Sequence, residues 1–356
     1  MLSKLPATIK SILYASTQWR KVSPLTVSAN SISQTPILAV CDPMTWHNLS
    51  SYHTAVAVTS TNWKLAFANS QKYKFFFCEA AWTGHMGSPW RAQVYKDGRV
   101  FHENRKKLLH IIEHCNREKI PTVFWAKEDP AYFQNEIYNF TDTALKFDYI
   151  LTTAEECIKK YQALGHNNVH LWPFAFSTEI FYPPNNEADE RENVAVFAGS
   201  WFSDHPQRCV ELAGIFDMVL ENDISLRIYD RNMLDGHSAK SFPKKYQHYV
   251  QNSVQYETLG ETYRKVLYAI NINTVCDSET MFARRVYEAM ACGAIVISNH
   301  SIGLRKQFDS SIWFLGEDFD HCDMHKIRQH NIDYVFANHT WQQRMEQLFQ
   351  IIGCND

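Results

Sequence analysis

The chain of 356 residues lacks several features that would assign it to a class at once. It has no run of 18 or more apolar residues, so no membrane-spanning helix is expected. Its nine cysteines include no C-x-x-C pair, which favours free thiols in a reducing cytoplasm. A formal net charge of -3 argues against binding along a nucleic-acid backbone, and no P-loop, nucleophile-elbow or H-E-x-x-H motif is present.

Residues 1–36 contain no aspartate or glutamate, but they carry Lys4, Lys10, Arg20 and Lys21 among many serines and threonines. This composition is similar to that of a transit peptide or a membrane-surface arm. Because the apolar periodicity is weak, the simpler interpretation is a basic, loose N-terminal extension. The sequence therefore predicts a cytoplasmic protein and leaves open a peripheral contact of this segment with the inner face of a membrane.

The chain has ample material for a core, since 45% of its residues are hydrophobic and 14% are aromatic. From Pro36 onward, short apolar runs alternate with amphipathic stretches of helix length. The expected strands are 37–41, 55–58, 74–79, 122–125, 148–152 and 169–172, and the expected helices are 62–69, 103–117, 133–144 and 154–164. Near-continuously apolar strands separated by helices indicate a parallel sheet.

A polar, charged stretch with two prolines, Pro183–Glu192, is typical of an interdomain linker. After it the alternation restarts. The expected strands are 194–198, 226–229, 270–273, 295–298 and 312–315, and the expected helices are 206–220, 261–268, 282–291, 324–336 and 341–352.

These patterns predict an α/β fold with two Rossmann-like, doubly wound domains that face each other across a cleft. The first spans 37–185, the second spans 186–340, and a C-terminal helix over 341–356 is expected to pack back on the first domain. Ligands of such sheets bind at the carboxyl ends of the strands.

Two features of the second domain suit an anion. Gly199 and Ser200 end its first strand, and a glycine there lets backbone N–H groups approach a phosphate. The alternative interpretation of Gly199 and Ser200 is an ordinary turn that binds no ligand. Arg208 lies on the following helix, and its side chain either points back to the strand end or is exposed to solvent.

A stronger signal follows the strand expected at 270–273. If a helix begins at Phe282, the N–H groups of Thr280, Met281 and Phe282 are unpaired donors at its start, where the helix dipole favours an anion.

Arg284, Arg285 and Glu288 share a face of that helix. The planar fork of arginine suits phosphate, and a carboxylate further along accepts ribose hydroxyls. The alternative is an exposed Arg–Glu pair that contributes about 0.3–0.5 kcal/mol.

Residues 278–293, SETMFARRVYEAMACG, resemble the signature of the CgeB-like glycosyltransferases, GT-B proteins related to the retaining clan that carries Glu-x7-Glu. The resemblance covers about residues 37–315. Its first-domain motifs are 60–63 STNW, 77–84 FCEAAWTG, 124–130 FWAKEDP and 147–153 FDYILTT.

By this resemblance, Glu288 holds the nucleotide ribose. The donor site expected in the second domain comprises Gly199, Ser200, Arg208, Ser278, Thr280, Met281, Phe282, Arg284, Arg285 and Glu288. Thr280 stands where the clan has its first glutamate, which contacts the donor sugar, so the donor is left open.

The resemblance implies metal-independent, retaining transfer of a sugar from a nucleotide sugar to a glycan, polysaccharide, protein or other hydroxyl acceptor, as in the synthesis of cell-surface polysaccharide. The donor is a substrate, and no further cofactor and no nucleic-acid partner are implied.

Acids and a histidine follow the expected strands of the first domain, where an acceptor would bind. The best candidates for catalysis are Glu79, His85, Glu128 and Asp129, together with Arg285 on the donor side. Taken singly, each is more often structural.

Asp318-Phe-Asp320 is a D-x-D string of the kind that sugar transferases of the other main fold use to hold a metal, but here it follows the last expected strand, far from where that fold places it. The spacing of His321, Cys322, His325 and His330 fits no zinc site, so no metal is predicted. An epimerase on the same fold and a non-catalytic sugar- or polymer-binding protein remain alternatives.

Overall fold

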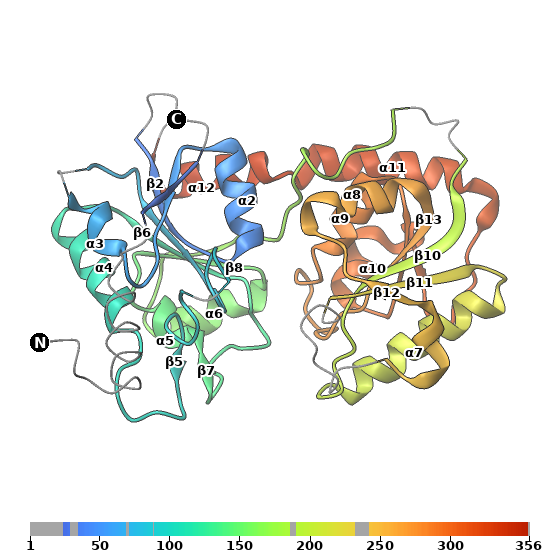
Figure 1. Ribbon diagram of the computed structural model, residues 1–356, viewed down its shortest axis with the longest axis horizontal. Coiled ribbons are helices and arrows are strands. Elements are labelled where there is room, and N and C mark those ends of the chain that lie inside the picture. Colours follow the sequence, from blue (N-terminus) through green and yellow to red (C-terminus); the bar gives the residue numbers. More distant parts are fainter. Residues whose placement is uncertain are drawn as a thin grey trace, which may run out of the picture. The chain divides into compact units, whose positions relative to one another are not determined.

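The computed structural model describes residues 24–28, 35–68, 71–87, 89–185, 190–231 and 242–354. Most of the expected extension over 1–36 and residues 186–189 of the expected linker lie outside this part. The chain forms two compact units, whose elements are labelled in Figure 1. The first unit comprises Met1–Trp125 and Gln134–Tyr149, and the second comprises Ala126–Phe133 and Ile150–Asp356.

The first sheet has seven strands in the order β1-β3-β2-β4-β6-β8-β9. Their bounds are β1 Thr26–Val27, β2 Ile37–Val40, β3 Ala55–Ala57, β4 Phe76–Glu79, β6 Thr122–Ala126, β8 Tyr149–Thr152 and β9 Val169–Leu171. β1 is antiparallel to β3, while β2 runs parallel to both β3 and β4. The chain passes from β2 to β3 and then returns to β4 on the other side of β2, so the strand order reverses between β2 and β4.

The helices around this sheet are α2 Pro43–Tyr52, α3 Trp63–Ala66, α4 Lys106–Arg117, α5 Phe140–Ala144 and α6 Glu155–Ala163. The helix expected over 133–144 is wrong in its first half, because Tyr138–Asn139 forms strand β7, which pairs with β5, Lys96–Asp97. Asn139 accepts the N–H of Asp142 and so starts α5 later than its apolar pattern suggests. The helix α2 was not expected. It begins with Pro43, a residue suited to a first turn.

The second sheet has six strands in the order β12-β11-β10-β13-β14-β15, and each strand is parallel to its neighbours. Their bounds are β10 Glu192–Gly199, β11 Ser225–Asp230, β12 Val250–Asn252, β13 Val266–Ile270, β14 Ile295–Ser298 and β15 Ile312–Phe314. Here the order reverses between β10 and β13. The strand expected at 270–273 is wrong, because β13 ends at Ile270. The helix before it, α8, ends in Arg264 and Lys265, cations that a helix C-terminus favours.

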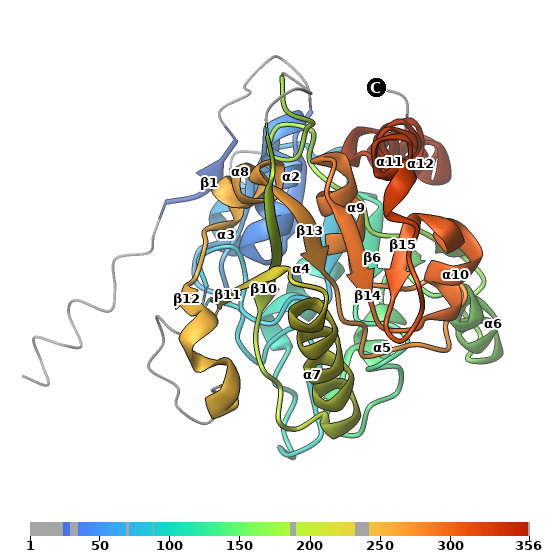
Figure 2. The same ribbon diagram turned by 90° about the vertical axis from the view of Figure 1, so that its right-hand side faces the viewer.

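Helices cover both faces of this second sheet (Figure 2). One core joins α7 to Ala195, Phe197 and Ile228, and the other joins α8, α9 and α11 to the opposite face through Val194 and Val196. The helices that follow β10 in the chain are α7 Pro206–Glu221, α8 Tyr256–Lys265, α9 Arg285–Ala291, α10 Ile302–Phe308, α11 Met324–Asn338 and α12 Trp341–Ile352. No residue of α12 belongs to either of these two cores.

The second unit starts earlier in the chain than the second domain expected from 186. Phe176, Ile180 and Phe181 belong to its core, and the indole N–H of Trp172 donates to the carbonyl of Arg344 at 2.8 Å. The apolar chain before the linker is therefore part of this unit. Packing of 341–356 on the first domain stays a prediction. Across the described residues, no helix combines the length and apolar character that spanning a membrane requires.

Gly260 in α8 offers a test of this packing. A Cβ atom at this position would lie 2.0 Å from the carbonyl oxygen of Ile180, a backbone atom that cannot move aside alone. Gly260→Ala is expected to lower the free energy of unfolding by about 1–3 kcal/mol through overpacking. Thermal and urea unfolding of the variant and the parent protein measure this change in the free energy of unfolding.

The matched control is Gly214→Ala in α7, where the added Cβ would meet only the side chain of Leu315 at 3.3 Å. Alanine favours a helix over glycine by about 1 kcal/mol, so this variant should be as stable as the parent or more so. Equal stability of the two variants would contradict the close contact of α8 with Ile180.

Candidate functional site

The carboxyl edge of the second sheet, at the reversal between β10 and β13, gathers arginine side chains. β10 ends at Gly199 and its neighbour β11 ends beside it at Asp230. The N–H of Arg231 donates to the Gly199 carbonyl at 3.2 Å. Arg285, from α9, donates from NH2 to the Ala198 carbonyl at 2.6 Å. A reversal of this kind is where doubly wound sheets bind ligands.

Gly199 lets Arg285 come close to this strand end. A Cβ atom on Gly199 would lie 3.3 Å from the Arg285 NH2 and 2.7 Å from the ring of Phe197. The Arg285 guanidinium lies over that same ring, 5.3 Å from its centroid. The glycine expected to admit a phosphate thus also admits a guanidinium. The next residue, Ser200, is buried, and its hydroxyl has no hydrogen-bond partner among the described residues.

Two further arginines share the electrostatic environment of Arg285. Arg208 from α7 is buried; it donates to the Ser200 carbonyl at 3.3 Å and lies over the Phe202 ring. Burial and the positive charge of Arg285 lower the pKa of Arg208 to about 10. Arg231 is exposed at the surface, yet crowding by protein atoms and the charges of Arg285 and Arg284 lower its pKa to about 10, while the neighbouring Asp230 carboxylate opposes this shift. All these groups are still cationic at pH 7, and they repel one another.

Arg284 differs from these three because it has a carboxylate partner. Its Nε donates to Glu288 Oε1 at 2.8 Å, and Glu288 is only 2% exposed. Burial alone would lower the pKa of Arg284, yet the neighbouring Glu288 carboxylate raises it. In the described part of the chain, Arg208, Arg231 and Arg285 form no ion pair with a carboxylate. We name Arg208, Arg231, Arg284 and Arg285 the arginine cluster.

The helix expected to begin at Phe282 in fact begins at Arg285 and has seven residues. Ser278 Oγ accepts the N–H of Met281 at 3.1 Å and that of Thr280 at 3.5 Å, so these donors are bonded within the loop. Phe282 is buried in the core. The expectation of unpaired N–H groups at a helix start is therefore wrong for Thr280 and Met281. The positive charge at this place comes from arginine side chains.

An amide ladder fixes the chain just before Arg284. The N–H of Ala283 donates to Asn273 Oδ1 at 2.9 Å, and the N–H of Asn273 donates to Asn299 Oδ1 at 2.9 Å. Asn299 in turn donates to Glu211 Oε2 at 2.7 Å. These buried polar groups follow β13 and β14 and hold the loop that carries the arginine pair.

Ser278 and Thr280 bond to the start of α6. The Thr280 hydroxyl donates to the Thr153 carbonyl at 3.1 Å and accepts the N–H of Glu155 at 2.9 Å, while Ser278 Oγ lies 3.2 Å from Glu156 Oε2. The hydroxyl of Thr280 thus already has a donor and an acceptor. Its position matches that of the clan's sugar-binding glutamate, but its side chain is engaged within the chain.

In the first unit, two carboxylates meet where the strand order reverses. Glu79 ends β4 and is fully buried; its two oxygens accept the N–H of Asp42 and the hydroxyl of Thr45. The Asp42 carboxylate accepts three N–H groups, from Trp82, Thr83 and Gly84, at 2.8–2.9 Å. Together they fasten the loop after β4 to the start of α2.

His85 lies at the end of that loop and is 9% exposed. Its Nε2 is 3.1 Å from the hydroxyl of Thr26 in β1, and its Nδ1 has no partner among the described residues. Burial lowers the pKa of the imidazole, so the ring is neutral at pH 7. It packs against Trp46 with 5.7 Å between ring centroids.

Asp129 follows β6 and is 3% exposed. Its Oδ2 accepts the hydroxyl of Thr152 at 2.8 Å, and Oδ1 lies 3.4 Å from the hydroxyl of Tyr161. Burial raises its pKa to about 7. Glu128, its neighbour, is half-buried.

The structure brings together Gly199, Ser200, Arg208, Arg284 and Arg285, as the sequence suggests. Sequence reasoning missed Arg231, although its place directly after a strand of the same edge was a usable signal. It also missed the fully buried Tyr263, whose hydroxyl is unpaired among the described residues and whose pKa burial raises.

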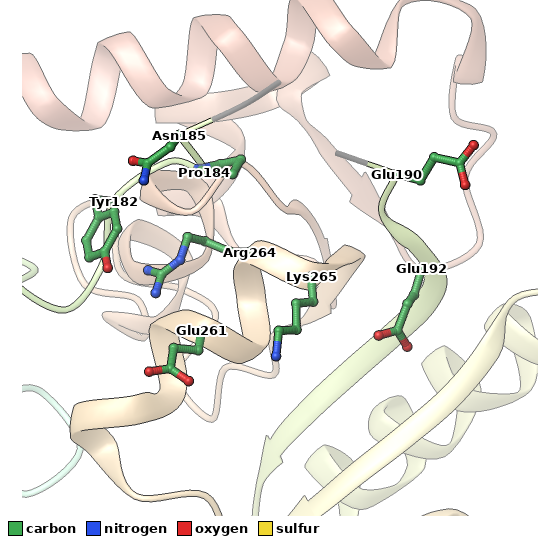
Figure 3. A pocket seen from close by; sticks show the side chains of 8 residues that line it. All are labelled: Tyr182, Pro184, Asn185, Glu190, Glu192, Glu261, Arg264 and Lys265. Atoms are coloured by element: carbon green, nitrogen blue, oxygen red, sulfur yellow. The ribbon is translucent and has the colours of Figure 1, made fainter. Parts of the chain in front are cut away.

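A cavity of about 500 Å³ lies elsewhere in the second unit (Figure 3). It is lined by Tyr182, Pro184, Asn185, Glu190, Glu192, Glu261, Arg264 and Lys265. Glu192 begins β10 and Gly199 ends it, so the cavity is at the opposite end of this strand, about 23 Å away at 3.3 Å per residue. Its charges are mixed in sign, and none of the expected site residues lines it.

No group of three or more His, Cys, Asp or Glu side chains within the described ranges is arranged to hold a metal ion.

Residues 222–350 match a family model described as glycosyl transferase-like. The matched stretch is about a third of the chain and contains Arg231, Arg284, Arg285 and Glu288. Among curated proteins, none matches the chain.

Solved structures are similar to the chain at low identity. Anabaena HepE in complex with UDP and glucose has a TM-score of 0.52 and 10% identity, with 79% of this chain and 78% of HepE covered. HepE with UDP has a TM-score of 0.51, 10% identity and 79% coverage of both chains. TarM has a TM-score of 0.47 and 8% identity, with 78% of this chain covered, and the chain spans 54% of its length.

At such identities, the likeness to HepE shows the fold alone. The α/β class with two Rossmann-like sheets, predicted from the sequence, is confirmed, and the fold is GT-B.

The buried Asp129 generates a pH prediction. Its folded pKa of about 7 exceeds the value of about 3.9 for an unfolded aspartate, so the folded state binds the proton more tightly between these values. Stability should therefore fall as pH rises through this window, by up to about 1.4 kcal/mol per pH unit. Asp129→Asn, which keeps an acceptor for Thr152, should remove that slope in urea unfolding at pH 5 to 8. The exposed Asp309→Asn should retain it, and identical slopes in all three proteins would contradict the assignment.

Proposed function

We propose that the chain is a glycosyltransferase of CgeB-like type that transfers a sugar from a nucleotide-sugar donor to a hydroxyl acceptor. The observation that carries this proposal is the arginine cluster around Gly199 at the reversal of the second sheet. The glycosyl transferase-like match over 222–350 contains most of the cluster and agrees with it. HepE, which has the same fold, is bound to UDP and to UDP-glucose in its solved structures.

The cluster suits a diphosphate. Three cationic groups without a carboxylate partner repel one another, and a bound dianion would relieve that repulsion. Arg208 lies on α7, Arg231 directly follows β11, and Arg285 begins α9, so a pyrophosphate seated at Gly199 would be contacted from three directions. The unpaired Ser200 hydroxyl supplies a further donor. In the proposed reaction these groups stabilise the charge that develops on the departing diphosphate.

Arg284 and Glu288 take a different role in this proposal. Glu288 is buried, and its ion pair with Arg284 orients its side chain. A carboxylate can accept hydrogen bonds from two hydroxyl groups, as ribose recognition requires. Arg284 thus acts through Glu288, and Arg285 acts on the phosphates.

On the acceptor side, His85 is the candidate base with the best supporting geometry. It is neutral at pH 7 and keeps one ring nitrogen unbonded among the described residues, whereas both oxygens of Glu79 and of Asp129 already accept hydrogen bonds. Glu79 and Asp129 therefore contribute mainly by shaping this region. Retention of configuration follows the resemblance, and under it no protein base is required.

Loss of Arg285 should weaken donor binding. The affinity of the wild-type protein for UDP, GDP, ADP and their glucose conjugates is measured by thermal shift and by calorimetry. Arg285→Ala should reduce affinity for the best ligand about 10- to 100-fold, because it removes charge-assisted hydrogen bonds to phosphate. Glu288→Gln should weaken the nucleotide but leave the weak binding of inorganic pyrophosphate unchanged.

Arg227→Ala is the matched control, since Arg227 lies on β11 but pairs with Glu192 at the other end of the sheet. It should bind every ligand like the wild type. Wild-type affinity in Arg285→Ala, or binding of no nucleotide by the parent protein, would refute the proposed donor site.

Turnover separates the alternatives. With the nucleotide sugar selected above and a set of hydroxyl acceptors, a transferase should release nucleoside diphosphate in an acceptor-dependent manner. Because arginines supply the positive charge, EDTA should leave the rate unchanged. Loss of the donor without any acceptor, with an isomeric sugar as product, would indicate the epimerase. Binding without turnover across the acceptors would indicate a sugar- or polymer-binding protein.

A further inference from the structure

The first unit exposes three apolar side chains on two neighbouring backbone segments. Phe101 is fully exposed, and Val100 and Ile137 are 37% and 42% exposed. The N–H of Gly98 donates to the Ile137 carbonyl at 3.0 Å, and β5 pairs with β7, so the turn after β5 lies against the chain before β7 (Figure 1). We name Val100, Phe101 and Ile137 the apolar tip.

The apolar tip stands on a well-bonded base. Arg99 forms two hydrogen bonds with the Asp97 carboxylate, at 2.8 and 2.7 Å. Asn104 donates to the carbonyls of Ala92 and Tyr95, both at 2.7 Å. Below these lies an aromatic cluster with centroid distances of 5.2–5.8 Å, made of Trp82, Tyr95, Tyr138 and Phe140. Side-chain hydrogen bonds therefore hold the backbone on both sides of Phe101.

The segment that carries Val100 and Phe101 is basic, while the exposed Glu136 lies next to Ile137, and Asp142 pairs with Lys96 and Arg105. Residues 91–107 contain six lysines and arginines and two acids, whereas the whole chain has a net charge of -3. Both acids, Asp97 and Glu103, are bonded to arginines. Lys106 and Lys107 are exposed in the first turn of α4, where the helix dipole disfavours cations. The position of these two lysines therefore does not stabilise α4.

We propose that the apolar tip and its lysines form a docking surface for an anionic lipid bilayer. Phe101, Val100 and Ile137 would enter the boundary between headgroups and acyl chains, while Lys106 and Lys107 contact anionic headgroups. The aliphatic pair distinguishes this partner from a single-stranded nucleic acid, which needs aromatic faces for stacking. The surface is independent of the proposed donor site and of residues 1–36.

Vesicle co-sedimentation of the full chain tests the surface. Wild type should bind vesicles of phosphatidylcholine mixed with phosphatidylglycerol and should bind pure phosphatidylcholine much less. Phe101→Ser should lower the partition coefficient about tenfold, and Phe101→Trp should retain binding, since tryptophan suits the interface. Lys106→Gln with Lys107→Gln should also lower it about tenfold or more and weaken its dependence on salt.

Val210→Ser is the matched apolar control, because Val210 is 66% exposed on α7 of the second unit. Lys244→Gln with Lys326→Gln is the charge control, and both controls should partition like the wild type. All these positions are exposed, so the variants should share the parent's thermal midpoint.

Three outcomes would overturn the docking surface. The wild type fails to bind anionic vesicles. Binding survives in the Phe101→Ser and lysine variants but disappears when Lys4, Lys10, Arg20 and Lys21 are changed to glutamine, which would assign it to the N-terminal segment. Or Phe101 proves necessary for binding a single-stranded oligonucleotide and not for binding vesicles.

Discussion

Mutual repulsion among guanidinium groups at the carboxyl edge of the second sheet is the constraint on which the candidate site depends. Arg285 lies against Phe197 and bonds to the Ala198 carbonyl, and Arg208 bonds to the Ser200 carbonyl. Carbonyl oxygens and ring faces solvate a cation without neutralising it. The chain therefore holds this charge in place and leaves its neutralisation to a ligand, which in the proposed function is a diphosphate.

The source of the positive charge affects how the site works. A helix start would offer fixed backbone dipoles, but the N–H groups of Thr280 and Met281 are bonded by Ser278, and α9 begins only at Arg285. Side-chain cations carry full charges and need positioning, which the Asn273–Asn299–Glu211 ladder provides for the loop before them. The buried amides of β13 and β14 are thus part of the site although none of them is charged.

Acidic groups in the first unit show the reverse arrangement. The carboxylates of Asp42 and Glu79 are surrounded by N–H and O–H donors, which is how a buried charge becomes tolerable. Their shared effect is to order the loop that leads to His85. In contrast, the apolar tip on the same unit leaves Phe101 fully exposed and Val100 and Ile137 partly exposed. The acids are thus satisfied inside the unit, whereas the tip offers apolar surface to solvent.

The sequence by itself determined the α/β alternation, the doubly wound class, and the pairing of Arg284 with Glu288, because these depend on local periodicity and on residues four apart. The sequence misplaced β13 and the start of α9. For β13, two apolar runs adjoin, 266–270 and 270–273, and the pairing of Val266–Ile270 with β10 and β14 decides that the first run is the strand. Tertiary structure alone brought Arg208, Arg231 and Arg285 to one strand end. Residues on α7, directly after β11 and on α9 meet there because the parallel strands end at the same edge of the sheet.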